Sequence, residues 1–76
     1  METLYKAREA CVTGRELISR EQLPYGNQSR YRLTLKEGLD GSECAKRLNL
    51  ASRYSFPRFY WDGANVIEED YYSIGD

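Results

Sequence analysis

The feature that most restricts the fold of this 76-residue chain is the Asp62-Gly63 pair, which stands between two runs of strand-forming residues. Such a pair is the strongest short-range signal for a β-hairpin, because both central positions of a type I′ turn need a positive φ. A four-residue loop over residues 62–65 would keep the same alternation of side chains. With either loop, the two faces of a hairpin over about residues 57–70 carry Phe59, Trp61, Ala64 and Val66 on one side and Arg58, Tyr60, Asn65 and Ile67 on the other.

A further strand is indicated by strict alternation over about residues 29–36. Tyr31, Leu33 and Leu35 alternate with basic or polar side chains. This is the pattern of a strand with one buried face, so we expect a half-buried strand whose outer face is basic.

Two helices are indicated by capping residues and by apolar residues at helical spacing. Asp40 and Glu43 have the spacing of a capping box at the start of a helix over about residues 41–51. Near the N-terminus, apolar residues at helical spacing predict a short helix over residues 3–12.

The segment that follows the first helix also has helical signals. Thr13 and Glu16 repeat the capping-box spacing, and Leu17, Ile18 and Leu23 fit a helical segment that stops before Pro24. Whether residues 3–23 form one kinked helix or two short ones is left open by this pattern.

Together these elements predict one small α+β domain spanning residues 1–76. The simplest arrangement is a three-stranded antiparallel sheet packed with two or three short helices. A chain of this length buries only about 60% of its extended surface, so its stability is expected to be marginal.

The composition argues against an enzyme. The chain has no histidine, which removes Ser-His and Cys-His dyads and the usual mixed zinc sites. Cys11 and Cys44 are too few for a four-cysteine zinc site, and the glycines fit no phosphate-binding loop. The run Glu68-Glu69-Asp70 alternates faces if it is a strand, and we interpret it as a solvated end. We therefore expect no catalytic residue, no cofactor and no metal.

The sequence also predicts a cytoplasmic location. It has no apolar run long enough to span a bilayer and no signal-peptide pattern at its N-terminus. In that compartment Cys11 and Cys44 are expected to be reduced and buried, because disulfides are rare there.

The favoured function is protein binding. Seven tyrosines exceed what a small core needs, and Tyr and Arg dominate interface hot spots. Small domains without catalytic residues are common among phage and mobile-element regulators, so we expect a regulator or inhibitor that occludes a host protein. Homodimerisation is a further expectation for so short a chain. The candidate partner-binding residues are Arg30, Arg32, Arg58, Tyr60, Tyr71 and Tyr72.

The alternative is a small DNA- or RNA-binding regulatory domain. The segment 41–51 has the pattern of the first helix of a helix-turn-helix, and the hairpin after it could act as a wing. A net charge of −1 and the helix-breaking Pro57 argue against this reading. Its candidate residues are Lys46, Arg47, Arg53 and Tyr54.

Overall fold

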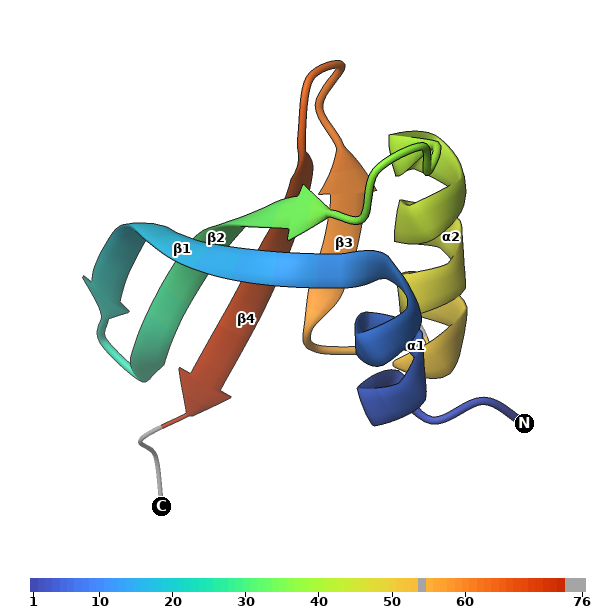
Figure 1. The fold of residues 1–76 in the computed structure, drawn as a ribbon. Coiled ribbons are helices and arrows are strands. Elements are labelled where there is room, and N and C mark those ends of the chain that lie inside the picture. The colour runs from blue at the N-terminus through green and yellow to red at the C-terminus, as the bar shows by residue number, and fades with distance from the viewer. Residues whose placement is uncertain (54, 74–76) are drawn as a thin grey trace.

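The computed structural model describes residues 1–53 and 55–73, which form two helices and one four-stranded antiparallel sheet (Figure 1). The strand order in the sheet is β1-β2-β4-β3. In chain order the elements are α1 (Leu4–Cys11), β1 (Val12–Leu23), β2 (Gly26–Leu35), α2 (Gly41–Ala51), β3 (Arg58–Trp61) and β4 (Val66–Ser73). The predicted α+β class is confirmed, whereas the sheet has four strands instead of three.

The extra strand is β1, where a second helical segment was predicted over residues 13–23. That prediction is wrong: Val12–Leu23 pairs along β2 in an antiparallel ladder. The ladder shifts register between Val12 and Gly14 and again between Leu17 and Ser19. Each bulge adds a residue to β1 and breaks the period-two alternation, which is why apolar residues there imitate helical spacing.

The β3–β4 hairpin has the four-residue loop and not the two-residue type I′ turn. Trp61 pairs with Val66, and Asp62 Oδ1 accepts from the amides of Ala64 and Asn65 at 2.8 and 2.7 Å. Gly63 takes a φ of 98°, a conformation that glycine adopts without strain. The register confirms the predicted division for the strand residues, with Phe59, Trp61 and Val66 on one face and Arg58, Tyr60 and Ile67 on the other. Ala64 and Asn65 lie in the loop, outside the ladder.

Both predicted helix starts are confirmed by their N-caps. Thr3 accepts from the Lys6 amide before α1, and Asp40 accepts from the amides of Ser42 and Glu43 before α2. The Glu43 side chain lies 3.7 Å from Lys46 and pairs with it instead of completing a capping box.

The core lies at one end of the sheet, where both helices cover one of its faces (Figure 1). Its largest fully buried apolar members are Leu48 of α2 and Val66 of β4, with Leu33 and Phe59 beside them. The far end of the β1–β2 hairpin projects beyond the helices, and the residues from Arg15 to Gln22 are all exposed. In the described part of the chain, no helix is long and apolar enough to cross a membrane.

The register gives the sheet two faces that differ in what covers them. The helix-side face carries Leu33, Val66 and Trp61 in one row across β2, β4 and β3. On the opposite face, which we call the open face, the two central rows are Arg32, Ile67 and Tyr60, and Arg30, Glu69 and Arg58.

Candidate functional site

Most of the predicted partner-binding residues come together on the open face. Arg30 and Arg32 lie on β2, Arg58 and Tyr60 on β3, and Tyr71 on β4, all on the face that neither helix covers. Tyr72 is the exception: the alternation of β4 places it on the helix-side face, and 71% of its surface is exposed. The structure thus brings five of the six candidates onto one surface.

The arginines of the open face are held in place by acidic and aromatic neighbours. Arg30 Nε donates to Glu69 Oε2 at 3.0 Å, and Arg32 Nη1 donates to Glu16 Oε1 at 2.9 Å. The Arg58 guanidinium lies 4.6 Å from the centre of the Phe56 ring. These contacts fix the orientation of long side chains, which lowers the entropy lost when a partner binds.

The strands of the open face carry balanced charge. Its arginines are Arg30, Arg32 and Arg58, and its carboxylates are Glu16, Glu21 and Glu69. The hydrogen bond and the charge of Glu69 raise the pKa of Arg30 above its ordinary value. A face with matched charges lacks the surplus of cations that binding to a phosphate backbone requires.

The edge of β3 is closed by a side chain of α2. Asn49 Nδ2 donates to Phe59 O, and Phe59 N donates to Asn49 Oδ1 at 2.8 Å. The amide therefore takes the place of a neighbouring strand at Phe59. Beside it, Asn49, Arg58, Phe59, Tyr60 and Glu69 line a shallow pocket of about 370 Å³.

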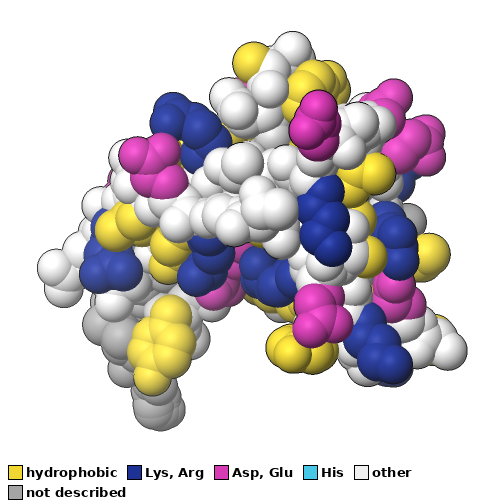
Figure 2. Space-filling view, in the orientation of Figure 1, with side chains coloured by type: hydrophobic (Ala, Val, Ile, Leu, Met, Phe, Trp, Pro, Cys, Tyr) yellow, Lys and Arg dark blue, Asp and Glu magenta, His cyan; other side chains and the backbone are white. Residues whose placement is uncertain are grey.

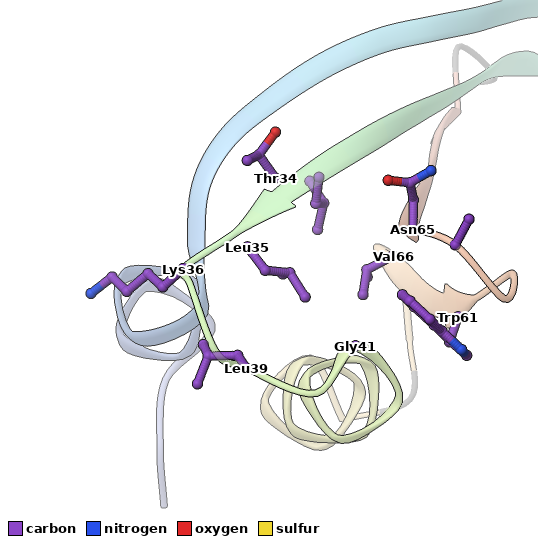
Figure 3. A pocket seen from close by; sticks show the side chains of 10 residues that line it. Thr34, Leu35, Lys36, Leu39, Gly41, Trp61, Asn65 and Val66 are labelled. Atoms are coloured by element: carbon purple, nitrogen blue, oxygen red, sulfur yellow. The ribbon is translucent and has the colours of Figure 1, made fainter.

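A second pocket, of about 320 Å³, lies at the end of the sheet where β2, the β3–β4 hairpin and the start of α2 meet (Figure 3). Leu35, Val66 and Trp61 line it, and Lys36 points away from it. The Trp61 indole packs so closely on Gly41 that a Cβ at that position would collide with the ring. The amides of Ser42 and Glu43 at this helix start already donate to Asp40, so they are not free for an anion.

The residues of the nucleic-acid alternative lie on or just after α2, and two of the cations are paired. Lys46 lies 3.7 Å from Glu43, and Arg47 forms a two-bond fork with Glu2. Arg53 follows the helix with a φ of 60°, and Tyr54 lies outside the described residues. The chain enters β3 without a second helix between residues 55 and 58, and the hairpin expected as a wing forms half of the sheet.

The acidic run of β4 is not the solvated end that the sequence indicated. Glu68 is fully buried on the helix-side face and accepts from both Arg8 and Arg15. Glu69 points to the open face, so the predicted alternation is confirmed. The cluster of Arg8, Glu68 and Arg15 was missed because Glu68 lies 60 and 53 residues from the two arginines in sequence. One signal in the sequence could have revealed it. Glu68 lies two residues after the apolar Val66, so on a strand both side chains point to the same, core-facing side.

Cys11 and Cys44 are both buried, and neither forms a disulfide. The pKa of Cys44 is raised to about 11, mainly by burial and secondly by a hydrogen bond with Cys11. In residues 1–53 and 55–73, no group of His, Cys, Asp or Glu is arranged to hold a metal ion. Comparisons with protein-family models, with curated proteins and with solved structures found no match for this chain.

Proposed function

We propose that this chain is a non-enzymatic binding protein that acts through protein–protein contact, with the open face of the sheet as its interface. The observation that supports this most directly is the convergence of Arg30, Arg32, Arg58, Tyr60 and Tyr71 on one face without a covering helix. Arginine and tyrosine are the residue types that contribute most to interface energies.

The charge of this face favours a protein partner over a nucleic acid. Its three arginines face three glutamates, so binding would not release the many counterions that drive association with a phosphate backbone. Ile67 lies between Arg32 and Tyr60 but is only 5% exposed, so the surface that the face offers a partner comes from Tyr60, which is 42% exposed, and from the arginines around it. Tyrosine and arginine are enriched in protein interfaces.

We extend this proposal to a mode of action: a regulator or inhibitor that occludes a surface of its partner in the cytoplasm, in a phage or mobile-element setting. A rigid sheet face suits occlusion, because it covers a partner without a change of its own shape.

The test is affinity capture from a lysate of the organism that encodes the chain. The baits are the wild-type chain, the variant Tyr60→Ser on the open face, and Lys46→Ser on α2 as an exposed control. We expect a partner that wild type and Lys46→Ser retain and that Tyr60→Ser loses. Equal capture by all three baits would show that the open face is not the interface.

A parallel titration with mixed-sequence duplex DNA and single-stranded RNA, followed by Trp61 fluorescence at two salt concentrations, tests the nucleic-acid alternative. Binding that weakens steeply with salt would replace our proposal by that alternative. In that case Lys46, Arg47 and Arg53 become the first residues to substitute.

A further inference from the structure

On the helix-side face, two arginines share one buried carboxylate. Arg8 donates through Nη1 and Nη2 to the two oxygens of Glu68 at 2.6 and 2.8 Å. Arg15 donates through Nε and Nη2 to the same oxygens at 3.2 and 3.0 Å. Two forks on one carboxylate fix both guanidinium groups in position.

This cluster carries one surplus positive charge. Burial raises the pKa of Glu68, but the hydrogen bonds and the charges of Arg8 and Arg15 together lower it by more, and the net pKa lies below the ordinary 4.5. Hydrogen bonds to Glu68 also raise the pKa of Arg8. At neutral pH the two guanidinium cations face the Glu68 anion. On the same face, the row through Ser29 adds the anion Asp70, which interacts with Arg8, and the cation Arg20, so this face keeps one surplus positive charge. Within the described chain, Arg15 Nη1 and Arg8 Nε donate to no acceptor.

The surplus charge can be reached from solvent. Glu68 is inaccessible, whereas 28% of the Arg8 side chain and 42% of the Arg15 side chain are exposed. Each guanidinium also lies against a ring, with Arg15 3.6 Å from the centre of Tyr31 and Arg8 5.4 Å from that of Phe59. The aromatic contacts support the two groups from the side, and among residues 1–53 and 55–73 their remaining N–H donors have no acceptor.

The molecule is hollowed between α1 and the projecting β1–β2 hairpin, and in Figure 2 basic side chains surround acidic ones at the head of this notch. The walls carry exposed apolar and aromatic groups. Leu17 is on the same face as Tyr31 by register, and Tyr72 is on the same face as Glu68. Tyr5 lies one turn before Arg8 on α1. Tyr5, Leu17 and Tyr72 are 70%, 47% and 71% exposed, which leaves most of their contact area for a partner.

We propose that this hollow binds an acidic segment of a partner protein, in which an Asp or Glu carboxylate meets Arg15 and Arg8 and neighbouring apolar side chains contact Tyr5, Leu17 and Tyr72. A carboxylate carries one charge and matches the surplus of the cluster. A phosphate dianion fits less well, because the Asp70 carboxylate lies on the same face close enough to Arg8 to interact with it. This site is on the opposite side of the sheet from the open face and does not depend on it.

The test is a titration of the isotopically labelled full chain, followed by NMR, with three probes. They are the blocked peptide Ac-Leu-Asp-Phe-Asp-Leu-NH2, its neutral counterpart with Asn in place of Asp, and inorganic phosphate. We expect the Asp peptide to shift the signals of Arg15 Nε–H, Tyr31 and Tyr72, and to bind at least about tenfold more tightly than the Asn peptide.

A matched pair of variants makes the test specific. Arg15→Gln removes the surplus charge and is expected to weaken binding of the Asp peptide by roughly tenfold. Arg30→Gln removes one positive charge from the open face instead and is expected to change this binding by less than about twofold. If Arg15→Gln does not fold, Tyr72→Ser tests the wall of the same hollow.

Several results would overturn the site. Equal binding of the Asp and Asn peptides, tighter binding of phosphate, or shifts confined to the open face would each contradict it. No shift at about 5 mM Asp peptide would do so as well, because that affinity is too weak for recognition. If Tyr60→Ser abolishes capture of a partner but leaves binding of the Asp peptide unchanged, the open face and this hollow act as independent sites.

Discussion

At the scale of single residues, Glu68 ties the fold together. Its carboxylate joins Arg8 of α1 and Arg15 of β1 to β4, so one side chain ties two consecutive elements to a strand that lies 60 and 53 residues further along the sequence. A buried charge with such partners adds little net stability when it is intact, but breaking the cluster leaves uncompensated charges behind.

We therefore expect Glu68→Gln to lower the free energy of unfolding by about 2–3 kcal/mol, which is below the full cost of a buried pair because both arginines are partly exposed. Urea denaturation measures this. The matched control is Glu69→Gln, which breaks the more exposed pair with Arg30 and is expected to cost less than about 1 kcal/mol. Equal losses in the two variants would contradict the special role of Glu68.

The same carboxylate predicts a pH dependence. Because folding lowers the pKa of Glu68 below 4.5, its contribution is complete above that pH and is lost as the pH falls through the folded-state pKa. The stability difference between wild type and Glu68→Gln should thus be largest near neutral pH and shrink below pH 4.5. Denaturation curves at several pH values measure it, and a difference that grows on acidification would refute the assignment.

At the scale of elements, the start of α2 and the end of β3 are fitted to each other through Gly41 and Trp61. The indole lies directly on the glycine backbone, and the ring is 41% exposed, so it is free to swing outward if displaced. A glycine within a helix would ordinarily be improved by alanine, by about 1 kcal/mol.

At position 41 we expect the opposite effect, a loss of stability when alanine replaces glycine. Gly41→Ala should destabilise the fold and shift the fluorescence emission of Trp61 to longer wavelength, because the added Cβ displaces the indole toward solvent. Ser42→Ala, one residue further into the helix, is the control and should leave the emission unchanged. An unchanged emission in Gly41→Ala would mean that the indole does not rest on the helix start.

The elements also show where sequence patterns succeed. Asp40 and the alternation through Leu33 predict α2 and β2 correctly, because each has one covered face that imposes a period on its residues. From Arg15 to Gln22, β1 has no covered face to impose a period, because all of these residues are exposed. Its two bulges also shift the register against β2. The arginine–glutamate cluster was hidden for a related reason: its partners meet only after the sheet has formed. The grouping of Arg30, Arg32, Arg58 and Tyr60 was predictable, because alternation along β2 and the hairpin fixes their face.

At the scale of the whole molecule, the mass is unevenly distributed. The chain extends over 41 × 27 × 17 Å, and the core cluster occupies one end of this length. At the other end, the β1–β2 hairpin is held by backbone pairing and by β4, with no helix over either face. Regions with few buried apolar contacts open at a lower free energy than the core.

We accordingly expect amide hydrogens at the projecting end, around residues 19–28, to exchange roughly 100-fold faster than those of Leu33 and Val66. Hydrogen exchange followed by NMR measures this residue by residue. Uniform protection along β1 and β2 would show that the hairpin and the core open as one unit.

The closed edge of β3 also determines how copies of this molecule could add to one another. Among the described residues no strand pairs with the outer edge of β1, whereas Asn49 occupies the backbone groups of Phe59 on the other edge. Two molecules that joined along β1 would therefore form a closed pair with two-fold symmetry, and a third would find no equivalent edge to extend the sheet. Because a single amide occupies the backbone groups of Phe59, strand addition at the β3 edge is disfavoured, and with it the growth of a fibre through that edge.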